Sequence, residues 1–189
     1  MNISIINFLG YLAHCVLPSV FVLYSTYRYH WTERAVGLTL TAVGVCSAIV
    51  QSTLVGPIVR RLGEQKTLIL GLVFGVVGFA IYGWAPSGEL FLLGIPVMAL
   101  WVLCGPAAQG LMTQRVGQNE QGQLQGAVSS LRGIAELVGP GLFTLTFSFS
   151  IRGGEFHSPG APFYLASLIL FGALLQTRGF QKETPGRSV

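Results

Sequence analysis

The sequence has 189 residues, of which 51% are hydrophobic and 10% are charged, whereas a soluble domain carries roughly 25% charged residues. This composition excludes both a water-soluble globule and an intrinsically disordered chain. The net charge of +4 is spread too thinly for a nucleic-acid surface. Three cysteines, Cys15, Cys46 and Cys104, lie far apart in apolar stretches, which excludes a disulfide scaffold. A polytopic membrane protein remains, and the mean hydropathy of +0.63 agrees.

Six apolar stretches follow one another, each long enough to cross a bilayer as a helix. The first lacks a basic start and a cleavage site, so we interpret it as a retained span and not as a signal peptide. The polar residues 179–189 are expected to form a disordered cytoplasmic tail. The predicted helices cover residues of about 4–27, 36–59, 67–86, 90–112, 123–149 and 161–177.

The lysines and arginines are distributed unequally between the two sides of the membrane. Seven fall on the side of both termini, three on the other side, and Arg132 lies inside a span. Because basic loops stay in the cytoplasm, both termini are predicted to be cytoplasmic. Four aromatic residues near span ends are expected to anchor the helices at the membrane interfaces: Tyr27, Tyr29, Trp31 and Trp84.

Polar side chains recur at helical spacing in the first, second, fourth and fifth stretches. Along residues 123–149 they step by 4, 3 and 4 residues, which places them on one helix face. The third and sixth stretches are almost uniformly apolar and can face lipid on all sides. We therefore predict a cavity walled by four helices and braced by two. The candidate lining residues are His14, Gln51, Gln109, Gln125, Ser129, Arg132 and Glu136.

Arg132 and Glu136 are the most informative pair, because a charge at membrane depth is costly and usually faces protein or water. At i,i+4 spacing they can pair on one helix. The pair either lines the cavity and exchanges partners with a substrate or a proton, or neutralises itself structurally. His14 is either a proton relay or a packing residue. Gln51 and Gln109 bind a polar ligand or join helices.

Glycine and proline mark further positions. The basic segment 56–66 reads as a tight cytoplasmic turn, with Gly63 permitting a sharp backbone path. Prolines and glycines within spans predict either hinges or close helix packing. No nucleophile elbow, zinc-binding helix or phosphate-binding loop occurs, so we expect no enzyme, no metal and no cofactor. The hinge candidates are Pro18, Pro106, Gly139 and Pro140.

Three motifs resemble the major facilitator superfamily, in particular the tetracycline-efflux drug/proton antiporters. The turn is similar to the loop signature G-x-x-x-D-R-x-G-R-R: Gly56, Arg61 and Gly63 match, and Arg60 replaces the aspartate. Residues 106–112 and 120–126, followed by Gly139 and Pro140, resemble the region of the tenth and eleventh helices of tetracycline exporters. Over residues 3–177, the chain is similar to the C-terminal six-helix half of such a protein.

The resemblance implies half of a major facilitator bundle, with a 3+3 repeat and the spans as helices seven to twelve. Helices seven, eight, ten and eleven surround the cavity in that family. It further implies a multi-pass protein of a bacterial inner membrane that exports a small amphipathic drug against protons. The partner within the lipid bilayer would be a complementary N-terminal six-helix half or a second copy. The alternatives are a truncated, non-transporting fragment and a homo-oligomeric small transporter of another solute.

Overall fold

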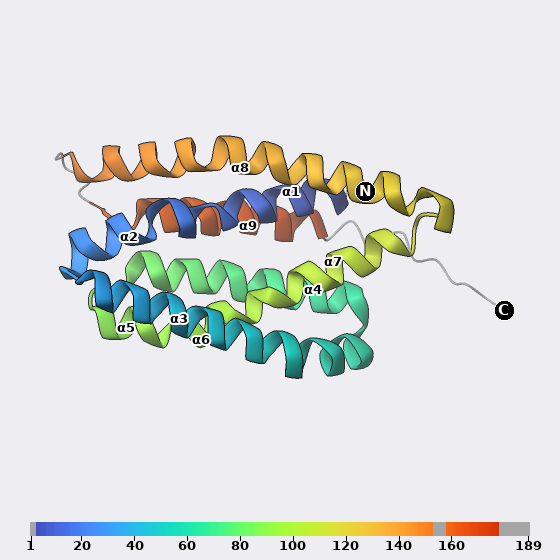
Figure 1. The fold of residues 1–189 in the computed structure, drawn as a ribbon, viewed down its shortest axis with the longest axis horizontal. Coiled ribbons are helices and arrows are strands. Elements are labelled where there is room, and N and C mark those ends of the chain that lie inside the picture. Colours follow the sequence, from blue (N-terminus) through green and yellow to red (C-terminus); the bar gives the residue numbers. More distant parts are fainter. Residues whose placement is uncertain (1–2, 153–157, 178–189) are drawn as a thin grey trace.

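The computed structural model describes residues 3–152 and 158–177, and all regular structure in these ranges is helical. The helices run along one long axis and the chain reverses at the ends (Figure 1). The tail predicted at 179–189 lies outside the described residues. The α-helices are α1 (Ile3–His14), α2 (Val16–Tyr29), α3 (Glu33–Ile49), α4 (Val55–Trp84), α5 (Gly88–Leu93), α6 (Ile95–Ala99), α7 (Cys104–Thr113), α8 (Gln121–Ile151) and α9 (Ala161–Thr177). Short π or 3₁₀ turns are η1 (Val50–Leu54), η2 (Leu100–Leu103) and η3 (Gln118–Glu120).

Within the described ranges, four helical stretches are long and apolar enough to cross a membrane. They are Ile3–Tyr29, Glu33–Trp84, Gly88–Thr113 and Gln118–Ile151, and α9 is a shorter apolar helix. The prediction of an all-helical membrane protein is therefore confirmed. The predicted helix 36–59 falls within the single 52-residue stretch, and so does the predicted helix 67–86 except for its last two residues.

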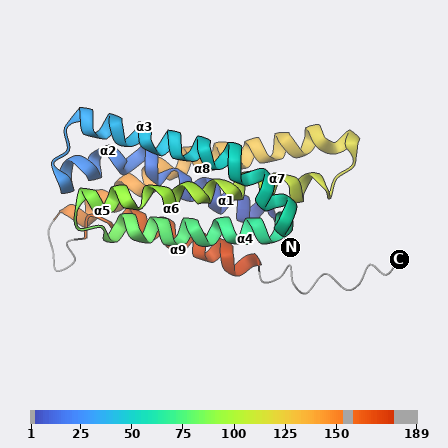
Figure 2. The ribbon, with the colours of Figure 1, turned by 90° about the horizontal axis from the view of Figure 1, so that it is seen from below.

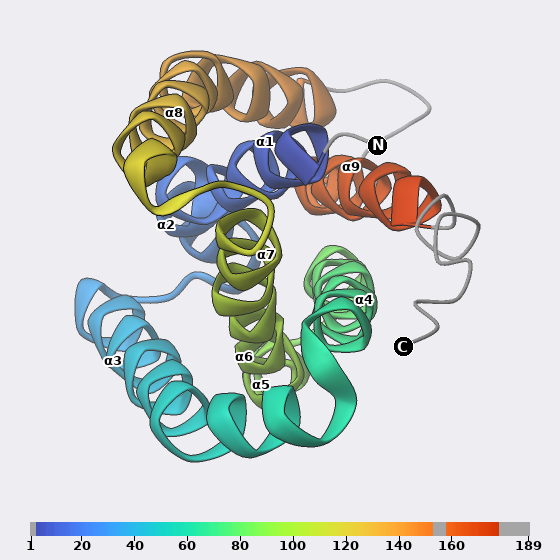
Figure 3. The ribbon, with the colours of Figure 1, turned by 90° about the vertical axis from the view of Figure 1, so that its right-hand side faces the viewer.

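That stretch turns at Gly63, the only described glycine with a positive φ. Its φ of 77° and ψ of 165° lie in a region open essentially to glycine alone. The π turn η1 and the first turns of α4 cross the end of the bundle, and the rest of α4 runs back through the bundle beside α7 and α9 (Figures 1 and 3). The loop predicted around 60–66 is thus a single non-helical residue between helical segments.

Replacing Gly63 with alanine is expected to destabilise the protein by about 1–3 kcal/mol, because a Cβ strains this backbone conformation. Gly56→Ala is the matched control, since Gly56 lies in the same segment and a Cβ there meets nothing within 4 Å. Thermal unfolding in lipid nanodiscs, followed by circular dichroism, measures both. Equal midpoints for the two variants would contradict the assigned turn.

Proline interrupts the first membrane stretch. Cys15 separates α1 from α2, and Pro18 follows one turn later. Pro18 has no N–H, and its ring collides with the carbonyl of His14, so the helix breaks there. Pro140 lies inside α8, which continues through it, and Pro106 lies in the first turn of α7 directly after η2.

Helix α4 packs most extensively against α9 and also against α7 (Figure 2). Its contact surface carries Gly71, Gly75 and Gly78, which are all buried. A Cβ at Gly75 would lie 2.7 Å from both Trp101 Cδ1 and Leu170 Cδ1. The expectation that the third and sixth stretches face lipid on all sides is therefore wrong, because small residues bring α4 close to its neighbours.

Aromatic residues gather at the end of the bundle where α2 meets α5. Tyr29 and Trp31 lie with ring centroids 5.4 Å apart, and each contacts the ring of Phe91. These two residues are half-buried in the cluster. Tyr27 and Trp84 are 42% and 63% exposed, as interfacial residues would be.

Candidate ligand cavity

A cavity of about 520 Å³ lies between α1, the α3–η1 segment, the α6–α7 segment and the middle of α8. Helix α4 contributes Leu68 and Leu72, and none of the lining comes from α9. Figure 3 shows the arrangement of these helices end-on. The volume suits a drug-sized ligand, and such sites are mostly apolar with a few polar groups. The polar lining consists of Asn7, Tyr11, His14, Ser47, Gln51, Cys104 and Arg132.

Three of the seven predicted lining residues reach this cavity: His14, Gln51 and Arg132. The structure does not bring the other four to it. Gln109 is half-buried on α7, and the remaining three lie exposed on α8. The physical reason is that α8 extends well beyond the cavity, so its polar face runs past the lining at both ends. The three residues on α8 outside the lining are Gln125, Ser129 and Glu136.

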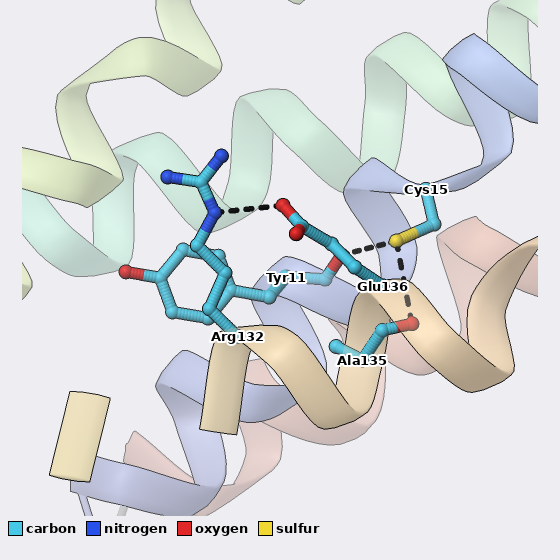
Figure 4. Close-up of polar contacts among 5 residues, drawn as sticks. All are labelled: Tyr11, Cys15, Arg132, Ala135 and Glu136. Carbon is cyan, nitrogen blue, oxygen red and sulfur yellow. Dashed lines mark hydrogen bonds and ion pairs between the residues drawn. The ribbon is translucent and has the colours of Figure 1, made fainter. Parts of the chain in front are cut away.

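Arg132 and Glu136 form an ion pair on α8, with 2.8 Å between Arg132 Nε and Glu136 Oε1. Their side chains are 62% and 55% exposed. The guanidinium carbon of Arg132 lies 5.9 Å from the centre of the Tyr11 ring on α1. In Figure 4, the two terminal nitrogens of Arg132 point away from Glu136. They make no hydrogen bond to the described part of the chain, so they are available to a ligand.

An aromatic surface completes this part of the cavity. The ring of His14, at the end of α1, lies 5.6 Å from the indole of Trp101 in η2. This contact supports a packing role for His14. Gln51 lies exposed on the π turn η1, a type of helix that often occurs at functional sites.

Most of the lining residues were not among the sequence candidates. Asn7 and Tyr11 precede His14 at helical spacing, so they carry the same periodic signal. Asn7 Nδ2 lies 3.7 Å from Met112 Sδ and links α1 to α7. Ser47 precedes Gln51 by one turn and carries the same signal. Trp101 had no signal, because it is apolar and lies in a 3₁₀ turn.

Helices α1 and α8 cross closely beside the ion pair. Cys15 Sγ lies 3.5 Å from the carbonyl oxygen of Ala135 (Figure 4). A Cβ at Gly139 would lie 2.8 Å from the same sulfur. Of the two roles that the sequence allowed for Gly139, a hinge or close helix packing, the structure supports close packing. Pro140 directly follows this crossing.

The loop-signature residues lie outside the cavity lining. Gly56, Arg60 and Arg61 are exposed in the first turns of α4, before the turn at Gly63. The next residue, Glu64, places its carboxylate where a Cβ of Gly110 on α7 would be. The absence of a side chain at Gly110 thus lets α7 accept the start of the main part of α4.

The fold and the cavity together define an all-helical membrane protein with a mainly apolar cavity that carries one arginine. The chain belongs to the Major Facilitator Superfamily, which it matches over residues 3–188. The family resemblance seen in the sequence is thereby confirmed.

The relatives include several tetracycline resistance proteins. The class H protein of Pasteurella multocida is 28% identical over 172 residues, which are 90% of this chain and 42% of that protein. The class G protein of Vibrio anguillarum is 35% identical over 136 residues, 70% of this chain and 34% of the relative. Hippocampus abundant transcript-like protein 1 of Bos taurus is 27% identical over 188 residues, which are 92% of this chain and 38% of that protein. The chain thus spans less than half the length of these relatives.

Proposed function

We propose that this chain forms the C-terminal six-helix half of a proton-coupled drug exporter in a bacterial inner membrane. We count the Glu33–Trp84 stretch as two spans because the chain turns back at Gly63, and we count α9 as the sixth. Six spans place both termini on the same side, and the excess of lysine and arginine on that side makes it the cytoplasmic one. The observation that carries the proposal is the cavity, whose polar lining comes from α1, the α3–η1 segment, α7 and α8.

The second half is part of the proposal, since alternating access needs two bundles that move about a shared site. Helices α3 and α8 flank the cavity and are poorly covered by the rest of the chain. On α3, Leu38 and Val45 are exposed, and on α8, Leu137 and Leu145 are exposed. We propose that these flanks face a complementary N-terminal six-helix half, with a second copy of this chain as the alternative.

The substrate class follows from the relatives and from the cavity. Tetracycline resistance proteins are among the relatives, and a mainly apolar cavity of about 520 Å³ suits an amphipathic drug such as tetracycline or its metal chelate. The Arg132–Glu136 pair would take part by exchanging partners with the substrate or a proton, because both side chains remain accessible.

Co-expression with the N-terminal half of a tetracycline resistance relative in a drug-sensitive bacterium tests this function. We expect resistance from the pair, none from either half alone, and a drug-induced proton leak in inverted vesicles. Unchanged resistance and no proton leak, with both halves present in the membrane, would reject the exporter and leave a non-transporting fragment. Resistance from this chain alone would favour assembly of two copies.

A further inference from the structure

We propose that Arg132 binds the acidic group of an aromatic, amphipathic ligand, so that this half of the protein recognises anions and not cations. The inference rests on the proposed function in taking the cavity as the ligand site. It goes further by specifying the charge of the ligand and the residue that recognises that charge.

The charged residues of the cavity lining favour an anionic ligand. Arg132 is charged, and no aspartate or glutamate occurs among the described residues that line the cavity. Glu136 holds the arginine by Nε alone and lies outside the lining. The two terminal nitrogens remain, and a guanidinium presents them as a planar fork that matches a carboxylate or another acidic oxygen pair.

The ion pair also orients the guanidinium. Glu136 fixes Nε at 2.8 Å, and the Tyr11 ring lies beside the guanidinium at 5.9 Å. With one donor held and one ring packed against it, the terminal nitrogens point away from Glu136 (Figure 4). An arginine held in this way loses less side-chain entropy when it binds a ligand.

The rest of the lining indicates the body of the ligand. Trp101 and His14 form an aromatic surface, and Leu17 and Leu72 add apolar area. Flat aromatic groups stack on such surfaces. A ligand with an acidic group on an aromatic body therefore satisfies both parts of the cavity. A positively charged chelate would need its counter-charge from the complementary half.

The test uses three probes with the same naphthalene body: 2-naphthoate, 2-naphthamide and 2-naphthylmethylammonium, which are anionic, neutral and cationic. Each is titrated calorimetrically into the full chain in nanodiscs of zwitterionic lipid. We expect the anion to bind at least about tenfold more tightly than the amide, and the cation to bind most weakly. In Arg132→Gln, the anion's advantage is expected to vanish while the affinity for the amide is unchanged.

Two further variants separate the proposed contact from general damage. Glu136→Gln is expected to raise the affinity for the anion several-fold. The amide oxygen of glutamine can still accept the hydrogen bond from Arg132 Nε and orient the guanidinium, whereas the competing negative charge is lost. Arg152→Gln is the control, since Arg152 lies over Phe149 at the C-terminal end of α8, outside the cavity lining, and the substitution is expected to leave all three affinities unchanged.

Equal affinities for anion and amide in the original chain would overturn the proposal. An anion preference that survives Arg132→Gln, or one that falls in Glu136→Gln, would also overturn it. Because these titrations require neither transport nor a second half, they are independent of the co-expression test. If resistance fails but the anion preference is observed, the exporter function is rejected and the acid site stands. If resistance is observed but the anion preference is missing, the acid site is rejected and the exporter function stands.

Discussion

Alanine at Gly139 is expected to destabilise the protein by about 1–3 kcal/mol, the usual cost of overpacking a close contact. Its Cβ would lie 2.5 Å from Cys15 Cβ and 2.8 Å from Cys15 Sγ. A Cβ cannot rotate away, so α1 and α8 must separate. Since Tyr11 and Arg132 face each other across the same two helices, the substitution is also expected to weaken binding of 2-naphthoate.

Gly133→Ala supplies the matched control on the same helix. Gly133 is exposed, and a Cβ there meets nothing within 4 Å. Alanine in a helix interior is favoured over glycine by roughly 0.5–1 kcal/mol, so this variant is expected to be neutral or more stable. Thermal unfolding in nanodiscs compares the two. If both variants shift the midpoint in the same direction and by the same amount, the close crossing of α1 and α8 is wrong.

Leucine at Gly10 is expected to block the cavity while the fold remains intact. Gly10 lines the cavity on α1, and a Cβ there meets nothing within 4 Å, so the added side chain enters the open volume. We expect the affinity for 2-naphthoate to fall at least about tenfold, which corresponds to about 1.4 kcal/mol. Export by the assembled halves is expected to be lost, and the thermal midpoint is expected to stay the same.

Gly44→Leu is the corresponding control, because Gly44 on α3 also has free space around it but does not line the cavity. Both variants add the same side chain to an exposed or cavity-facing helix position. Titration calorimetry gives the affinity, and circular dichroism confirms that each variant is folded. Unaltered binding in the Gly10 variant would show that the ligand binds elsewhere.

The close helix crossing connects the fold to the candidate site. Pro18 breaks the first membrane stretch at Cys15, and the sulfur of Cys15 lies against the Ala135 carbonyl of α8. One turn from Ala135 on the same helix, Arg132 lies over Tyr11 of α1. The helix break at Cys15 and its close contact with α8 therefore determine how Arg132 is positioned against α1.

Much of this architecture could be predicted from the sequence. Long apolar stretches must form helices in lipid, so hydropathy alone predicted the helical class. The predicted segment 161–177 has the bounds of α9, and segment 123–149 lies within α8. Gly63 was identified as a turn because glycine alone adopts its backbone conformation readily. Each of these results depends on local chemistry.

The lining of the cavity was decided by the tertiary structure. Helical periodicity showed that Gln125, Ser129, Arg132 and Glu136 share a face, but only Arg132 lies level with the cavity. Periodicity describes the rotation of side chains about one helix axis and contains no information on the height of that helix relative to its neighbours. Trp101 joined the lining for a related reason, since the packing of a 3₁₀ turn placed an apolar residue beside His14. Composition and spacing thus determined the helices, the sequence motifs carried the resemblance to the family, and the packing of α1 against α8 determined which side chains meet.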